Sequence, residues 1–126
     1  MKLLIADDET LTREGLVSSI DWESLGITEI YQADDGVNGL QIARRHKPDI
    51  ILSDVRMPRM DGDEATREIR ALDRPDAASL PIIAETADAF EEGQRRAREA
   101  GMTALTTKPL NTHALIALLA EHIPEK

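Results

Sequence analysis

The chain has 126 residues, with 15 Lys and Arg against 24 Asp and Glu and a net charge of −9, and this length is typical of one domain. The acidic balance argues against a domain that binds nucleic acid or an anionic membrane mainly through phosphates, since such binding needs clustered cations. Cysteine is absent, which excludes disulfides, thiolate catalysis and cysteine-ligated zinc. The longest apolar run extends only from Ala114 to Ala120, and no secretory signal precedes Asp7, so we expect a cytoplasmic protein that does not enter membranes.

Short apolar segments alternate along the chain with segments of helical periodicity. The first apolar segment covers residues 3–6, and Leu11, Leu16 and Ile20 then fall on one face of an expected helix. Further apolar segments at 28–33 and 49–53 are each followed by a helical pattern of apolar positions. Those positions are Val37, Leu40 and Ala43 in one pattern and Ala65, Ile69 and Leu72 in the other. The first half of the chain therefore predicts successive strand-and-helix units.

The alternation continues in the second half. An apolar segment at 81–85 precedes an expected helix over 87–100, for which Gly101 is a suitable left-handed cap. The last segment, 102–107, precedes a helix that Asn111 or Thr112 can cap. Several of these segments are almost entirely apolar, which is typical of strands buried on both faces of a parallel sheet. The whole pattern predicts an α/β fold, a doubly wound five-stranded parallel sheet with five helices.

Polar residues stand at the carboxyl ends of the expected strands. Asp7-Asp8-Glu9 follows the first strand, Asp54 the third, Thr86 the fourth and Lys108-Pro109 the fifth. In open α/β sheets, ligands bind outside the carboxyl ends of the strands. We therefore expect these carboxylates, the hydroxyl and the ammonium to meet at one edge of the sheet.

This set of groups suits phosphoryl transfer with a divalent cation. Neighbouring carboxylates repel one another, and a hard cation with oxygen ligands is the usual remedy. Mg²⁺ takes one or two carboxylates and keeps waters and a phosphoryl oxygen, and a carboxylate beside it can attack phosphorus. Lys108 would neutralise the phosphoryl oxygens, and the Thr86 hydroxyl would donate a hydrogen bond to one of them.

Each of these features also has a simpler interpretation when it is taken alone. The triplet Asp7-Asp8-Glu9 is typical of an acidic helix N-terminus, and Asp54 before a Met-Pro loop is typical of a turn. Lys108-Pro109 can end a strand, and Thr86 can fill one. The joint pattern favours a site, because all four features fall at expected strand ends in the order that the fold requires.

The motifs at these positions carry a family resemblance over essentially the full length of the chain. The chain resembles the response-regulator receiver domain, the CheY-like module of two-component signalling, and we expect one receiver domain over residues 1–126. The resemblance implies a flavodoxin-like sheet with strand order 2-1-3-4-5. The matching residues are Ile5–Glu9, Pro48–Pro58, Met60-Asp61-Gly62, Thr86-Ala87 and Lys108-Pro109.

The resemblance implies a role for each residue at the strand ends. Asp54 would accept a phosphoryl group from a phosphohistidine on a sensor histidine kinase or a histidine phosphotransfer protein. Asp7, Asp8, Asp54 and the main-chain carbonyl of Arg56 would hold Mg²⁺, for which Mn²⁺ can substitute. Lys108 and Thr86 would contact the phosphoryl group. We expect no enzyme activity beyond metal-dependent self-phosphorylation and slow autodephosphorylation.

The output of the family implies a partner surface formed by the helix over 87–100, the strand over 102–107 and the last helix. The strand departs from the family here, because Leu105 occupies the position of an aromatic residue that turns inward on phosphorylation. Switching could be weaker or rely on packing, and a leucine that only fills space is an equal alternative. Glu85 ends an apolar strand; we expect it near the edge of the sheet, because its burial would be costly. We expect a monomer or a weak dimer.

Two alternatives remain open on the sequence. Residues 1 to about 62 resemble receivers attached to AraC-type outputs, whereas the remainder resembles receivers of hybrid sensor kinases, so a chimera or an engineered scaffold with weak or lost switching is an alternative to ordinary divergence. A phosphatase that forms an aspartyl phosphate would need an Asp-x-Asp pair after the first strand. Asp7 and Glu9 stand there instead, and no cap insertion is present, so this alternative is disfavoured.

Overall fold

The computed structural model describes residues 1–87, 91–108 and 111–123. Each strand is followed by a helix, as the apolar and helical segments predict. The strands are β1 (Lys2–Ala6), β2 (Glu29–Ala33), β3 (Ile50–Asp54), β4 (Ile82–Thr86) and β5 (Ala104–Thr107). The helices are α1 (Thr10–Ser19), α2 (Gly36–His46), α3 (Gly62–Arg70), α4 (Glu91–Ala100) and α5 (Thr112–His122), with a short 3₁₀ helix at Glu23–Leu25.

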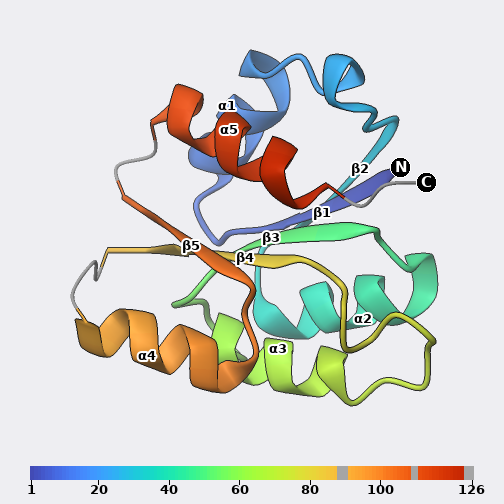
Figure 1. The fold of residues 1–126 in the computed structure, drawn as a ribbon, viewed down its shortest axis with the longest axis vertical. Coiled ribbons are helices and arrows are strands. Elements are labelled where there is room, and N and C mark those ends of the chain that lie inside the picture. Colours follow the sequence, from blue (N-terminus) through green and yellow to red (C-terminus); the bar gives the residue numbers. More distant parts are fainter. Residues whose placement is uncertain (88–90, 109–110, 124–126) are drawn as a thin grey trace.

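The five strands form one parallel sheet in the order β2-β1-β3-β4-β5, which confirms the predicted fold class and strand order. Figure 1 shows α1 and α5 on one face of the sheet and α2, α3 and α4 on the other. Strands β3 and β4 are buried at every position, whereas the edge strand β2 is partly exposed. Because helices cover both faces, the central strands need apolar side chains in both directions, which explains their nearly continuous apolar sequences.

Strand alternation divides the core into two clusters, one on each face of the sheet. Under α1 and α5, the side chains of Ile5, Leu52 and Ile83 pack with Leu115 and Leu119. The opposite cluster lies under α2, α3 and α4, and its strand members are Leu4, Ile51 and Ile82. With only three aromatic residues in the chain, aliphatic side chains fill both clusters.

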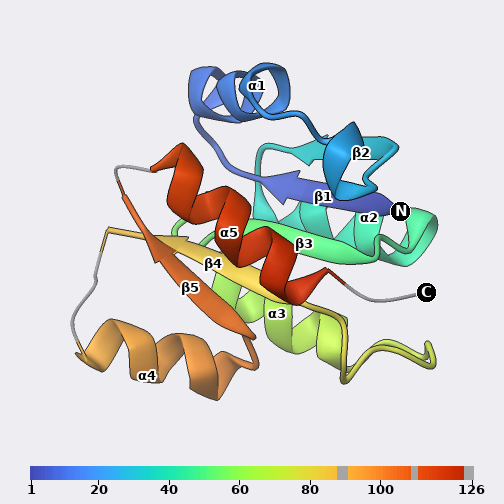
Figure 2. The same ribbon diagram turned by 45° about the horizontal axis from the view of Figure 1, so that its top comes forward.

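Trp22 is the single tryptophan of the chain, and it lies in the connection between α1 and β2. Its side chain is buried with the cluster under α1 and α5, and its indole N–H donates to the main-chain carbonyl of Val17 at 3.1 Å. The Ile27 N–H donates to the Trp22 carbonyl, and the Thr28 N–H donates to the Met1 carbonyl, so Trp22 lies near the residues where β1 and β2 begin. Asp7 and Asp54 stand at the other end of the strands (Figure 2 shows the course of β1 and β2).

The local signals for helix ends are mostly confirmed. Asn111 is the N-cap of α5 and its side chain accepts from the Ala114 N–H at 3.1 Å, while Gly101 after α4 has a φ of 100° in the left-handed region. Helix α4 begins at Glu91 in the described part of the chain, and residues 88–90, which the sequence analysis assigned to this helix, lie outside the described residues. No helix in the described ranges combines the length and the apolar content needed to cross a membrane.

One expected core position is wrong. Leu11 is 86% exposed, although the helical pattern placed it on the apolar face of α1 with Leu16 and Ile20, both of which are buried. Leu11 belongs to the first turn of α1, which starts at Thr10 beside the carboxyl end of β1. The covered part of the sheet ends there, so the first turn of the helix has no layer to pack against.

Arg70, at the end of α3, joins segments that are distant in the sequence. Its guanidinium group donates to the main-chain carbonyls of Gly101 at 2.7 Å, Ala77 at 3.0 Å and Leu80 at 2.6 Å. Burial lowers the pKa of Arg70 from its ordinary value. These carbonyls belong to the end of α4 and to the connection between α3 and β4, so one side chain holds three neighbouring segments together.

We expect Arg70→Met to lower the free energy of unfolding by on the order of 3 kcal/mol, because these carbonyls lose a charged donor while the apolar stem is kept. Urea denaturation measures this change. The matched control is Arg67→Met, which replaces an exposed arginine of the same helix and should cost less than about 0.5 kcal/mol. Equal losses in the two variants would contradict the bridging role of Arg70.

Candidate functional site

The functional residues expected from the sequence meet at the carboxyl edge of the sheet. Asp7 directly follows β1, Asp54 ends β3, Thr86 ends β4 and Lys108 directly follows β5. The arrowheads of β1, β4 and β5 point to the same side of the molecule in Figure 2, as the parallel pairing requires. The parallel register therefore brings together residues as distant in the sequence as Asp7 and Lys108.

Three of the carboxylates form a compact group. Asp7, Asp8 and Asp54 each offer an oxygen, and these oxygens lie within 4.8 Å of one another. Asp7 is fully buried and Asp54 is 4% exposed, whereas Asp8 is exposed. Because three ionised carboxylates at this separation repel one another, the arrangement needs compensation by positive charge.

The hydrogen bonds of Asp7 indicate where that positive charge would fit. Its Oδ1 accepts from the Glu9 main-chain N–H at 2.9 Å, but its buried Oδ2 has no hydrogen-bond donor among the described residues as long as the neighbouring Glu85 is ionised. The N-cap of α1 is Glu9, and its side chain makes no capping hydrogen bond. An acidic helix N-terminus therefore does not account for this cluster, and a buried carboxylate oxygen without a donor fits a divalent cation with oxygen ligands.

Lys108 supplies a positive charge on the other side of Asp54. Its Nζ lies 3.0 Å from Asp54 Oδ2 in a largely buried ion pair. Burial raises the pKa of the Asp54 carboxyl, while the hydrogen bond and charge of Lys108 act in the opposite direction. For Lys108, desolvation lowers the pKa, but the hydrogen bond to Asp54 and the nearby carboxylates outweigh it and leave the pKa raised. Lys108 thus stays charged beside the carboxylate.

These groups line an open hollow of about 420 Å³. Thr86 is 8% exposed and reaches the hollow from β4, and Arg56 lies on the loop after β3, where its main-chain N–H is 3.4 Å from Asp54 Oδ1. Asp7 lies buried next to this lining rather than in it. The lining residues are Asp8, Glu9, Asp54, Val55, Arg56, Thr86, Ala87 and Lys108. Pro109, the second residue of the Lys108-Pro109 motif, lies outside the described residues.

The expectation that Glu85 avoids burial is wrong. Glu85 is fully buried, and neither of its carboxyl oxygens has a partner among the described residues when the group is ionised. Burial, followed by the charge of Asp7, the hydrogen bond with Asp7 and the charge of Asp54, raises the pKa of Glu85 to about 8. A protonated Glu85 can donate to Asp7, whereas two ionised carboxylates can only accept. The raised pKa favours the neutral form of Glu85, which is much less costly to bury than the carboxylate.

Strand register explains why Glu85 belongs to the site. Glu85 pairs with Asp54 across β3 and β4, and its side chain shares the sheet face of its strand neighbour Ile83, under α1 and α5. Thr86 points to the opposite face. The motifs of the sequence predict Thr86 in the site and assign no role to Glu85. Counting strand alternation from the apolar positions would have placed Glu85 beside Asp54.

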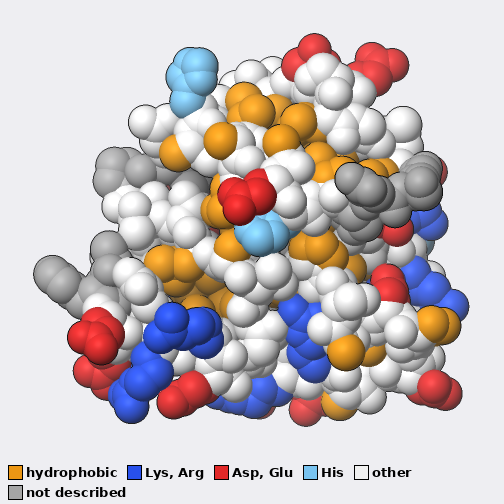
Figure 3. All heavy atoms as spheres, viewed as in Figure 1, with side chains coloured by type: hydrophobic (Ala, Val, Ile, Leu, Met, Phe, Trp, Pro, Cys, Tyr) orange, Lys and Arg blue, Asp and Glu red, His pale blue; other side chains and the backbone are white. Residues whose placement is uncertain are grey.

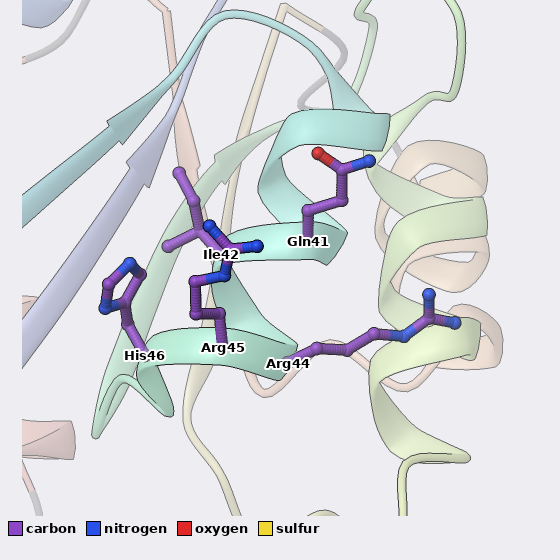
Figure 4. Close-up of a pocket in the computed structure, with 5 residues that line it drawn as sticks. All are labelled: Gln41, Ile42, Arg44, Arg45 and His46. Carbon is purple, nitrogen blue, oxygen red and sulfur yellow. The ribbon is translucent and has the colours of Figure 1, made fainter.

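A larger hollow, of about 510 Å³, lies on α2 and not at this edge. Figure 4 shows its lining side chains projecting from the helix, with Arg44 extending toward α3. Arg44, Arg45 and His46 form the last turn of α2, where cations stabilise a helix carboxyl end, and His46 stacks on Tyr31 with ring centroids 4.4 Å apart. Among the described residues no carboxylate lines this hollow, so it lacks both the acidic oxygens that suit Mg²⁺ and an aspartate that could accept a phosphoryl group.

The fold and the edge cluster agree with a comparison to known families. The response regulator receiver domain family matches residues 3–120, so the chain belongs to that family of two-component signalling domains, which is not a family of catalytic enzymes. The sensor histidine kinase RcsC of Salmonella typhi is 36% identical in an alignment that covers 98% of this chain and 13% of RcsC. The chain therefore spans only a small part of that relative.

Two solved structures are similar over nearly the whole chain. An AraC two-component transcriptional regulator from Clostridium phytofermentans is 38% identical with a TM-score of 0.81, and the match covers 98% of this chain and 91% of that one. The receiver domain of a sensor histidine kinase from Pseudomonas aeruginosa is 32% identical with a TM-score of 0.79, over 97% and 96% of the two chains. That crystal structure has a magnesium ion coordinated in its active site cleft.

The pKa of Glu85 predicts a pH dependence of stability in metal-free buffer. Between its ordinary pKa of 4.5 and the folded value of about 8, the native state keeps a proton that the unfolded state has lost. The free energy of unfolding should therefore fall as pH rises through this window, by up to about 1.4 kcal/mol per pH unit, and level off above it.

Glu85→Gln should remove this part of the slope, because the amide has no proton to lose. Urea denaturation between pH 5 and 9 in the presence of a chelator measures it, with the exposed Glu121→Gln on α5 as the matched control. Parallel pH profiles for wild type and Glu85→Gln would contradict the assignment of a raised pKa.

Proposed function

We propose that the chain is a phosphoacceptor domain in which Asp54 accepts a phosphoryl group from a phosphohistidine on a partner protein. The observation that carries the proposal is the meeting of Asp54 with Lys108 at 3.0 Å and with Asp7 and Asp8 within 4.8 Å at one open hollow. This arrangement brings together a nucleophile in Asp54, a positive charge in Lys108, and the further acidic oxygens of Asp7 and Asp8. Membership in the receiver family supports the same assignment.

The residues that would hold Mg²⁺ or Mn²⁺ are Asp7, Asp8, Asp54 and the main-chain carbonyl of Arg56. The buried Asp7 Oδ2 without a donor supports this set, as does the magnesium ion in the similar kinase receiver domain. When bound, the cation would neutralise charge on the phosphoryl oxygens as the phosphorus is transferred. Asp7 and Asp8 would then be held at short separation without mutual repulsion.

In the proposed reaction, Asp54 attacks the phosphorus in line with the bond to the donor imidazole nitrogen. The O–P bond forms as the N–P bond breaks, and the electron pair of that bond returns to the imidazole, which leaves with the partner. Lys108 holds Asp54 in place before transfer and would then contact the phosphoryl oxygens as a point charge. The Thr86 hydroxyl would donate to one of these oxygens. Positioning by the sheet edge therefore supplies most of the catalysis.

The donor that we propose is a sensor histidine kinase or a histidine phosphotransfer protein, and the similarity to RcsC supports this class. We further propose that residues 1–126 act as one cytoplasmic receiver domain, as a monomer or a weak dimer, with neither nucleic acid nor membrane as a partner. The single sheet and the family match over residues 3–120 support one domain. The net charge of −9 supports the absence of nucleic acid.

The proposed output surface consists of α4, β5 and α5. A hollow of about 330 Å³ lies between α4 and β5, and Leu105 contributes to its lining and packs partly buried against the core. Figure 3 shows apolar side chains exposed between α5 and α4, with charged side chains over α4. Because Leu105 has no ring to rotate, we propose that switching here relies on aliphatic repacking.

The alternatives from the sequence gain no specific support. The similarity to an AraC-type regulator and the similarity to a sensor kinase each cover 98% of the chain, so neither is confined to one half. The chimera and the scaffold with weak or lost switching therefore stay untested predictions. Labelling of Asp54 together with a phosphorylation-dependent change at the output surface would set the scaffold aside.

Asp54→Asn should abolish phosphorylation, because the amide cannot attack phosphorus. The chain is incubated with acetyl phosphate and Mg²⁺, and the acyl phosphate is measured by intact mass and hydroxylamine sensitivity. A parallel sample with a chelator should stay unlabelled. Stoichiometric labelling of Asp54→Asn at another residue would refute the assignment of the acceptor.

Asp8→Asn should weaken Mn²⁺ binding by roughly tenfold or more, since it removes one charged ligand from the cluster. Asp8 is exposed, so the fold should keep its stability. Electron paramagnetic resonance of free Mn²⁺ measures the affinity. Glu9→Gln is the matched control, because Glu9 lines the same hollow but lies outside the cluster of three carboxylates. Equal effects of the two changes would indicate general electrostatic attraction and not ligation.

A further inference from the structure

The loop between β3 and α3, residues 55–61, carries Arg56 and therefore one proposed ligand of the cation. Its base is closed by the Gly62 N–H, which donates to the Val55 carbonyl at 2.7 Å, and by the Val55 N–H, which donates to the Glu85 carbonyl at 3.1 Å. These bonds fix the two ends of the loop. At its tip Arg59 has a φ of 69° in the left-handed region, and the Met60 N–H donates to the Pro58 carbonyl at 2.8 Å across it, so this short turn still needs an anchor to the rest of the protein.

The tip is held by the start of α2. Asp35 is 5% exposed, and its Oδ2 accepts from the Arg59 guanidinium at 3.1 Å. Its Oδ1 accepts from the Asn38 main-chain N–H at 2.7 Å as the N-cap of α2. The neighbouring Gly36 lies so close to the loop that a Cβ there would stand 1.8 Å from the Met60 carbonyl oxygen. The loop thus contacts α2 directly through both side chain and backbone.

We propose that Asp35 and Arg59 are positioning residues for the cation site, because their ion pair holds the tip of the loop that presents the Arg56 carbonyl. This inference rests on the proposed function, since it concerns the same site. Neither residue belongs to the lining of the hollow or to the carboxylate cluster. Apart from the long-range effect of their charges, the two can therefore act on the site only through the loop.

Two physical arguments favour a positioning role over an incidental surface pair. A left-handed conformation is unfavourable for a residue with a Cβ, so Arg59 keeps it only while other contacts hold the loop there. The Asp35 carboxylate is buried, and a buried charge needs a partner that satisfies it. Loss of the pair would let the loop relax, and a displaced carbonyl is a poorer ligand.

Charge removal and loop positioning predict opposite signs for Arg59→Gln. Removing a cation from the vicinity of a divalent cation site would tighten metal binding if only long-range electrostatics mattered. Loss of positioning would weaken binding, on the order of tenfold for a residue that orients a ligand. The direction of the change therefore separates the two causes.

The test measures Mn²⁺ affinity by electron paramagnetic resonance for wild type, Arg59→Gln, Asp35→Asn and the double variant. Asparagine at position 35 keeps an N-cap acceptor, so α2 should still form. We expect roughly tenfold weaker binding in each single variant, and a double variant no weaker than the weaker single one, because both changes break one contact. Arg44→Gln, on the exposed last turn of α2, is the charge-matched control and should bind as wild type does.

Unchanged or tighter binding by Arg59→Gln, or additive losses in the double variant, would overturn the proposal. A further variant, Arg59→Gly, keeps the left-handed backbone without the guanidinium, and wild-type binding by it would also overturn the role of the ion pair.

Amide hydrogen exchange without metal separates failure of this inference from failure of the proposed function. The positioning role predicts faster exchange of residues 56–62 in Arg59→Gln and Asp35→Asn than in wild type. If wild type binds no Mn²⁺, the proposed cation site fails, and this exchange result still decides whether the pair holds the loop. Unchanged exchange in both variants would overturn the inference even if wild type binds the metal.

Discussion

Mutual repulsion among carboxylates at the carboxyl edge of the sheet is the constraint on which the rest of the site depends. Asp7, Asp54 and Glu85 point to one face of adjacent strands, and burial strengthens every interaction between them. Three devices offset the repulsion: the Lys108 ammonium beside Asp54, the proton that Glu85 retains, and the place beside Asp7 and Asp8 where a cation fits. The folded state tolerates an acidic edge because each device removes or balances one negative charge.

Because side chains alternate along a strand, the residues at the carboxyl edge of the sheet point to its two opposite faces. Glu85 points with the carboxylates toward α1 and α5, and Thr86 points the other way. Thr86 also lines a small cavity beside α4 that includes Asp63 and Arg96, whose charged atoms are 4.0 Å apart. Asp63 is 6% exposed, and its Oδ1 has no partner in the described part of the chain. A change at Thr86 thus adjoins a poorly satisfied polar contact between α3 and α4, in the direction of the proposed output surface.

The fold was predictable because its signals are local. Continuous apolar strands, helical periodicity and caps such as Asn111 and Gly101 each depend on a few neighbouring residues, and the parallel topology then places Asp7, Asp54, Thr86 and Lys108 together. The contacts that could not be predicted are those between side chains distant in sequence. The hydrogen bonds from Arg70 to Gly101 and from Arg59 to Asp35 are examples, since no sequence pattern predicts either contact. The prediction for Leu11 was wrong for a related reason. Periodicity shows which side chains share a helix face, but not how far along the helix that face is covered by the sheet.

The location of Trp22 has a practical consequence for spectroscopy. It is the only indole in the chain and lies in the core at the end of the strands remote from the acidic edge. Its fluorescence therefore reports loss of the hydrophobic layer under α1 and α5, with little direct quenching by an ion such as Mn²⁺ bound at the far edge. Emission intensity gives an optical signal of folding that needs no attached dye and stays largely independent of events at the carboxylates.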